Sequence, residues 1–214
     1  MGAKTWMLVY SDGAASQALK SRPELDRNAS AALAKKLFPS EKLEPLEDGD
    51  LSFTCPPDDE LIIGCFPGVS IIAAKEFGID YPSKLPSRFV EYARGNTVYL
   101  HAMHSVVDWF AYAIWKDGKL QRSLSLAPNS GVLEDIGSKL SFEEPYWAGK
   151  HPAIDPEEDE ADYPFVFHPL ELGEAALAEL FGYQLEGVID PSHLEPESIP
   201  LVRYKRVKPW WKLW

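Results

Sequence analysis

The dipeptide Asp117-Gly118 constrains the fold of this chain more than any other feature, because it separates two runs of alternating sequence. Asp-Gly favours a two-residue type I′ turn, the commonest connection of a β-hairpin. If Lys116 faces Lys119, the register of both strands is fixed. A further β-prone run, Thr97 to Met103, precedes them. The sequence therefore predicts a three-stranded antiparallel meander over residues 97–126.

Alternation of side chains along this hairpin predicts two different faces. One face is expected to be core and carries Trp109, Ala111, Ala113, Trp115, Leu120, Leu124 and Leu126, with Arg122 as an awkward member. The opposite face carries Asp108, Phe110, Tyr112, Ile114, Gln121, Ser123 and Ser125. Hydrogen-bonding groups gather at the Asp108 end of this second face. We therefore expect Tyr112, Ser123 and Ser125 to line a binding site there.

The remaining segments indicate an α+β fold. Periodic apolar residues predict helices at about 23–38 and 170–181, the second ending at Gly182, and a shorter helix near 86–94. Residues 5–10, 61–66 and 69–73 are predicted strands. We expect a mainly antiparallel sheet of about five to seven strands, a common size, with the helices packed on one face. The 214 residues, of which 45% are hydrophobic, fit one domain over residues 1–200 followed by a tail.

The most unusual polar residues of the meander are His101, His104, Ser105 and Asp108, which lie inside an apolar run. On a helix they would share one face and resemble a metal or acid–base cluster. In a strand, His104 and Asp108 share a face while His101 and Ser105 point away. A nucleophilic triad through Ser105 would lack the G-x-S-x-G elbow. The structural alternative is that the histidines bond to backbone and Asp108 holds a loop.

The C-terminal tail, residues 201–214, differs in charge from the rest of the chain. It contains five basic residues and no acid, whereas the whole chain carries a formal charge of −12. Its three tryptophans, Trp210, Trp211 and Trp214, are candidate binding residues for a membrane surface, single-stranded nucleic acid or an acidic partner. The alternatives are docking of the tail on its own acidic body, or exchange between subunits of a homo-oligomer.

Composition excludes several function classes. The acidic balance argues against binding of double-stranded nucleic acid by the body of the protein. No stretch is long enough for a transmembrane segment, and no secretory signal is present at the N-terminus, so we expect a cytoplasmic protein. Cys55 and Cys65 have no metal-ligand spacing and are expected to be buried thiols. The acid-rich segment 155–162 lacks the calcium-loop pattern and is expected to be a solvated loop. No phosphate-loop or dinucleotide motif is complete, and we expect no cofactor.

Several motifs over roughly the first 190 residues resemble an uncharacterised actinobacterial family known only as a domain of unknown function. They include Met1 to Gly13, Gly64-Cys-Phe-Pro-Gly68, Thr97 to Trp109, Arg122 to Pro128, Glu144-Pro-Tyr-Trp-Ala-Gly149 and His168 to Ala176. The resemblance implies a bacterial cytoplasmic setting and a single-domain unit. It implies no reaction, cofactor or catalytic residue.

Two functions follow from these observations. The first is a non-catalytic binding or regulatory protein that joins a protein partner or a second copy of itself through the tail. The second is a hydrolase-like enzyme, with or without a metal ion, in which His104 and Asp108 act as base and orienter or as metal ligands. His101 and Ser105 would then lie nearby. The enzyme requires His104 and Asp108 to meet in a cleft that is open to solvent.

Overall fold

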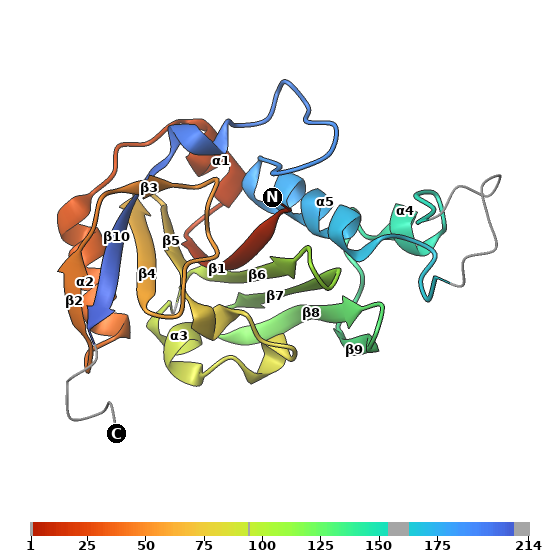
Figure 1. Ribbon diagram of the computed structural model, residues 1–214, viewed down its shortest axis with the longest axis horizontal. Helices are drawn as coiled ribbons and strands as arrows, with labels where there is room; N and C mark the ends of the chain where they lie inside the picture. Colours follow the sequence, from red (N-terminus) through yellow and green to blue (C-terminus); the bar gives the residue numbers. More distant parts are fainter. Residues whose placement is uncertain (1, 94, 154–162, 208–214) are drawn as a thin grey trace.

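A computed structural model describes residues 2–93, 95–153 and 163–207. In these ranges one ten-stranded sheet organises the fold, and every pair of neighbouring strands is antiparallel (Figure 1). The order across the sheet is β2 (Lys42–Pro45), β10 (Pro200–Val207), β4 (Glu60–Phe66), β5 (Val69–Ala73), β1 (Lys4–Ser11), β6 (Thr97–His104), β7 (Trp109–Lys116), β8 (Lys119–Ala127) and β9 (Gly131–Ile136). The short β3 (Gly49–Asp50) also pairs with β10. The predicted α+β class and antiparallel sheet are confirmed.

The predicted meander is present as β6, β7 and β8. Asp117 and Gly118 have φ angles of +51° and +74°, as a type I′ turn requires, and Lys116 pairs with Lys119. Two residues further on, however, the register shifts: Trp115 pairs with Leu120, but Ile114 pairs with Arg122. Gln121 is therefore the extra residue of a β-bulge.

This bulge makes the predicted assignment of faces wrong for β8. Beyond Gln121 each β8 side chain points to the face opposite to the one expected, because alternation restarts after the extra residue. Leu124 and Leu126 lie with Phe110, Tyr112 and Ile114 in one core, and Ser123 and Ser125 lie under the other. Gly137 accommodates the bulge: its φ is +84°, and a Cβ there would lie 2.0 Å from the carbonyl oxygen of Gln121. Both faces of the hairpin are therefore buried.

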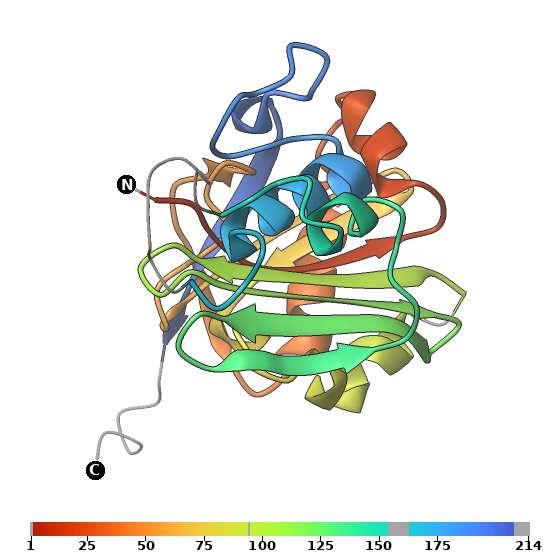
Figure 2. The same ribbon diagram turned by 90° about the vertical axis from the view of Figure 1, so that its right-hand side faces the viewer.

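Helices cover both faces of the sheet, which corrects the expectation that they pack on one. The described helices are α1 (Ala15–Lys20), α2 (Arg27–Leu37), α3 (Ser87–Tyr92), α4 (Glu144–Trp147) and α5 (Pro169–Phe181), with 3-10 turns at Lys75–Phe77, Pro82–Lys84 and Pro196–Ser198. In Figure 1, α5 lies above β6 and β7, and α3 lies below them. Figure 2 shows α1 and α5 together over one face of the twisted sheet.

The helix predicted at 170–181 is confirmed, including its left-handed cap at Gly182, where φ is +80°. The helix predicted from residue 23 begins later, at Arg27. Asp26, which caps it, accepts a hydrogen bond from the amide of Ala29 at 2.8 Å. Pro23 therefore lies in the link between α1 and α2 and not in the first turn of a helix, where proline is common.

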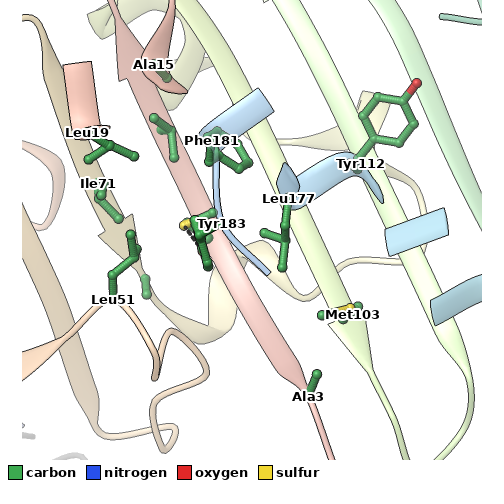
Figure 3. Packing of buried hydrophobic residues seen from close by; sticks show 14 of the residues in the cluster. Ala3, Ala15, Leu19, Leu51, Ile71, Met103, Tyr112, Leu177, Phe181 and Tyr183 are labelled. Atoms are coloured by element: carbon green, nitrogen blue, oxygen red, sulfur yellow. Dashed lines mark hydrogen bonds between the residues drawn. The ribbon is translucent and has the colours of Figure 1, made fainter. Parts of the chain in front are cut away.

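The two faces carry two separate hydrophobic cores. The core below α1 and α5 is shown in Figure 3, where Leu177, Phe181 and Tyr183 lie over strand residues such as Met103 and Ile71. The second core joins α2 and α3 to the opposite side of the same strands, through residues such as Leu37, Phe89, Leu100 and Trp115. Each fully buried side chain of this size contributes about 1.5–3 kcal/mol. A sheet covered on both sides explains why its central strands are apolar almost throughout.

Residues 200–207, most of which we expected to start a tail, form β10 between β2 and β4. Its basic residues pair with acids of the body: the Arg203 guanidinium lies 2.8 Å from the Glu60 carboxylate, and Lys205 Nζ lies 2.7 Å from Asp59 Oδ2. The Arg206 guanidinium bonds to Glu41 and Glu76. The first half of the predicted tail is therefore part of the sheet. The other predictions for the tail, with Trp210, Trp211 and Trp214, and those for residues 155–162 lie outside the described residues.

Candidate functional site

His101 is fully enclosed between β6 and α5. Its side chain is 0% exposed, with Nε2 at 3.0 Å from the carbonyl oxygen of Gly173 and Nδ1 at 2.7 Å from Thr5 Oγ1. A carbonyl can only accept, so Nε2 carries the proton and the Thr5 hydroxyl donates to Nδ1. Burial lowers the pKa of His101 to about 4. His101 is therefore a neutral group that joins a helix to the sheet.

His104, Ser105 and Asp108 lie at the turn between β6 and β7, where each has different partners. His104 Nδ1 accepts a hydrogen bond from the amide of Val106 at 3.3 Å. Asp108 has a φ of +48°, and its Oδ2 lies 3.7 Å from Nε2 of His168. Among the described residues, no hydrogen bond or ion pair joins His104 to Asp108 or Ser105. His104 and Asp108 would share a face in a continuous strand, but here a turn separates them.

Ser105 packs against the backbone of Gly2. A Cβ added at Gly2 would lie 2.2 Å from Ser105 Oγ, so only glycine allows this close approach. The amide of Ser105 donates to the carbonyl oxygen of Ala3 at 3.2 Å. These contacts hold the turn against the start of the chain. They give Ser105 no base, and no activated nucleophile follows.

The structure does not bring Tyr112, Ser123 and Ser125 to one surface, because the bulge places Tyr112 on one face and both serines on the other. All three side chains are buried. The Tyr112 hydroxyl donates to Glu143 and the Ser123 hydroxyl donates to Glu134. Ser125 Oγ accepts from Trp109 Nε1 at 3.2 Å. Each side chain is therefore bonded inside the protein.

A buried ion pair explains the awkward Arg122. Its guanidinium, 1% exposed, donates to both carboxylate oxygens of Glu143, at 2.9 and 2.6 Å, and also binds Asp135. Burial opposes ionisation of Glu143, but hydrogen bonds from Arg122 and Tyr112 hold its pKa below the ordinary value. No sequence pattern marks Glu143, which lies 21 residues from Arg122 in the loop before α4. The network ties that loop to β8.

An open site lies instead at the start of β1, in a cavity of about 900 Å³ that we call the N-terminal cleft. Three segments form its walls: residues 2–6, residues 52–58 and residues 184–197; His104 adds a fourth contact. The amide of Trp6 donates to the carbonyl oxygen of Thr54 at 2.8 Å, which fixes the second wall beside β1. The amides of Leu185 and Leu194 bond to Glu174 and to the carbonyl oxygen of Gly182, which fixes the third wall to the end of α5.

The cleft combines apolar walls with an acidic rim. Trp6, Phe53, Leu185, Ile189 and Leu194 supply apolar surface. Five carboxylates, those of Asp58, Glu186, Asp190, Glu195 and Glu197, line it against one cationic side chain, that of Lys4. An anion entering the cleft meets net negative charge, so the site favours neutral or cationic molecules.

The cleft is lined by one thiol, Cys55, and by the imidazoles of His104 and His193. The charge of Lys4 acts on both Cys55 and His104. Burial raises the pKa of the Cys55 thiol, and Lys4 only partly opposes this. Burial, and then Lys4, lower the pKa of His104. At neutral pH the site therefore holds a thiol and a neutral imidazole, and a thiol is a poor nucleophile. No hydrogen bond links Cys55 to His104 in the described part of the chain.

Sequence reasoning found His104 but missed the rest of the cleft. The prediction that Cys55 is buried is wrong, because its side chain is about half-buried beside Lys4. The 184–197 segment carries few sequence signals beyond its prolines. Its role as a wall depends on Glu174, a helical residue whose carboxylate binds it.

Two further observations concern the class of protein. Among the described residues, no helix has the length and apolar character needed to cross a membrane, and no group of three or more His, Cys, Asp or Glu is placed to hold a metal ion. Residues 5–204 match the model of a family described as "Family of unknown function (DUF6928)". No curated protein and no solved structure matches the chain.

Proposed function

Since the chain belongs to this family of unknown function, we propose a role from its own geometry: it is a non-catalytic binding protein. Its ligand is a small organic molecule with an apolar body, neutral or cationic, held in the N-terminal cleft. The observation that carries this proposal is a cavity of about 900 Å³, within the range of small-molecule sites, with apolar walls and a net negative rim.

The state of the polar groups favours binding over hydrolysis. A hydrolase needs a nucleophile or an activated water next to a positioned base. His104 lies in the cleft, but Asp108 pairs with His168 instead, and Cys55 stays protonated at neutral pH. A cytoplasmic location is part of this proposal. So is a protein partner or a second copy bound through residues 208–214.

The test compares three ligands with the same aromatic body and different charge: phenethylamine, phenethyl alcohol and phenylacetate. Isothermal titration calorimetry measures the binding of each to the full chain. We expect the amine and the alcohol to bind and phenylacetate to bind at least ten-fold more weakly. Equal affinity for all three, or binding of phenylacetate alone, contradicts the proposed cleft.

A pair of matched variants locates the binding. Phe53 lines the cleft and is 48% exposed, whereas Tyr81 is 46% exposed and lies outside the cleft. Phe53→Ala should weaken binding several-fold, while Tyr81→Ala should leave it unchanged, because both remove a half-exposed ring and only one ring faces the ligand. If both variants bind like the original chain, the ligand sits elsewhere.

A further inference from the structure

A second cavity, of about 880 Å³, lies along the other side of the 184–193 segment, beside α5. We call it the α5 cavity. It shares Gln184, Glu186 and His193 with the N-terminal cleft, so these residues form a wall between the two. Its opposite wall is the exposed side of α5, with the aromatic rings of Phe142 and Tyr146 at one end.

Glu174 is the unusual member of this cavity. Its side chain is 8% exposed, and Oε2 accepts a hydrogen bond from the amide of Leu185 at 2.8 Å. Oε1 is buried and has no hydrogen bond of normal geometry among the described residues, although the Glu186 amide lies close enough to lower the pKa of this carboxyl. A buried carboxylate oxygen without a partner is unfavourable, and native proteins rarely retain one. When Glu174 is ionised, the partner that Oε1 lacks is a hydrogen-bond donor.

The charged residues that line the α5 cavity favour a positively charged donor. Three more carboxylates line the α5 cavity, those of Glu171, Glu179 and Glu186, and no lysine or arginine does. Apolar and aromatic surface comes from Phe142, Tyr146 and Leu170, and three imidazoles, those of His151, His168 and His193, also line the cavity. Carboxylates attract a cation, and aromatic faces hold one by cation–π contact.

We propose that the α5 cavity is a second binding site, for a compact primary ammonium compound whose N–H group donates to Glu174 Oε1. This site is independent of the ligand proposed for the N-terminal cleft. A primary ammonium fits because it supplies both a positive charge and hydrogen-bond donors, and a short alkyl chain can lie against Leu170 and Tyr146. A quaternary ammonium supplies the charge alone.

The proton balance of binding follows from the same carboxyl. Burial raises the pKa of Glu174 to about 7, so near pH 6.5 much of it is protonated in the free protein. An ammonium that binds the carboxylate must displace this proton to solvent. The other titratable groups around this part of the molecule are Glu171, Glu179, Glu186, Tyr146, His151, His168, Tyr183, His193, Lys20 on α1 and His101 on β6.

The experiment measures n-butylammonium binding to the full chain by calorimetry at pH 8.5 and at pH 6.5. At pH 6.5 it is repeated in buffers with different ionisation enthalpies, which count released protons. We expect tighter binding at pH 8.5 and release of up to one proton at pH 6.5. Tetramethylammonium should bind at least ten-fold more weakly. Equal binding of the two cations reduces the site to a general acidic surface and overturns the proposal.

Two variants on the same helix separate Glu174 from its neighbours. Glu174→Gln should weaken butylammonium binding ten-fold or more and abolish most of the proton release. Glu179→Gln removes an exposed carboxylate of the same cavity, where solvent screens the charge, and should change affinity less than three-fold. Equal losses in the two variants contradict a specific role for Glu174. If Glu174→Gln does not fold, the comparison of n-butylammonium with tetramethylammonium on the unmodified chain remains the test.

Phe53→Ala distinguishes the two sites. It should weaken phenethyl alcohol binding in the N-terminal cleft without affecting butylammonium. If Phe53→Ala weakens both ligands equally, one cleft takes both and the second site does not exist. Failure of the aromatic ligands to bind at all leaves the butylammonium result intact.

Discussion

The imidazole of His101 donates to the carbonyl oxygen of Gly173, 3.0 Å away, and this bond joins the central strand β6 to the middle of α5. The contact requires both residue types. The histidine supplies a donor inside an apolar layer, and the glycine allows the helix backbone to approach. A Cβ at Gly173 would lie 3.0 Å from Met103 Sδ and 3.1 Å from Cδ2 of Phe110.

His101 makes the fold sensitive to acid. Its pKa falls from an ordinary 6.5 to about 4 in the folded state, so unfolded chains bind protons first. Stability is therefore complete above pH 6.5 and is lost as the pH falls toward 4, by roughly 3 kcal/mol from this group. In His101→Gln, an amide replaces the titrating ring. The slope of urea-unfolding free energy against pH should flatten between pH 6.5 and 4; an unchanged slope assigns the acid sensitivity to carboxylates alone.

Gly173→Ala should destabilise the protein by about 1–3 kcal/mol, because the added methyl group overpacks the contact with Met103 and Phe110. The gain in helix propensity, about 1 kcal/mol, is too small to reverse the sign. Gly13→Ala is the control, since a Cβ there has no neighbour within 4 Å. It should change stability by less than about 0.5 kcal/mol. Chemical denaturation measures both, and equal effects contradict the close approach of α5.

The Arg122–Glu143 pair should show strong coupling. Glu143→Leu leaves a buried guanidinium without its main partner and should cost about 3–5 kcal/mol. Arg122→Met combined with Glu143→Leu removes both charges and should recover most of this loss. A double-mutant cycle from urea unfolding measures the coupling. If the losses of the two single variants simply add, the pair contributes nothing as a unit.

Glu174 should weaken the fold at high pH. Its pKa is raised to about 7, above the ordinary 4.5, so the folded state holds a proton that the unfolded state has already lost. Stability therefore falls as pH rises from 4.5 to 7, by about 3 kcal/mol at most. Glu174→Gln should be more stable than the original chain at pH 8 and nearly equal to it at pH 4.5. Thermal unfolding at both values, with Glu179→Gln as a flat control, measures this.

Two truncations separate the strand from the predicted tail. A chain that ends at Val207 keeps every strand pair described here, so its melting temperature should stay within a few degrees. A chain that ends at Ile199 loses β10, which leaves β2 without its partner and β4 paired only with β5, so it should lose cooperative unfolding. Sedimentation of the full chain against the chain ending at Val207 then tests whether Trp210, Trp211 and Trp214 mediate self-association. Identical sedimentation rejects that role.

The parts of the fold that sequence predicted are those fixed by local chemistry. Asp117-Gly118 can form few other turns, and Gly182 ends α5 because its backbone is left-handed. The faces of β8 were not predictable in this way, because one extra residue at Gln121 reverses them and the reason lies far along the chain, in the Glu143 carboxylate that Arg122 must reach. The alternation of apolar and polar residues along β8 does not indicate that Arg122 has a buried partner at Glu143.

The candidate site was predictable only in part for a similar reason. His104 was identified because a polar group in an apolar strand is conspicuous. Its expected partner Asp108 turns away at a positive φ and meets His168, 60 residues later in the chain. The walls of the cleft, residues 52–58 and 184–197, come together only in the folded protein. Both are loop segments without the apolar periodicity that predicts a helix or a strand, so their sequences do not indicate where they lie.

The position of β10 has a consequence for the making of the protein. This strand is inserted between β2 and β4, yet it is the last of the described strands to leave the ribosome. Until then one edge of β4, which contains Leu61, Ile62 and Ile63, has no strand to pair with. Glu41, Glu60 and Glu76 also lack the arginines of β10 with which they form ion pairs. β10 can therefore pair only after every other described strand has been synthesised, and until then the edge of β4 is open to pairing with other strands.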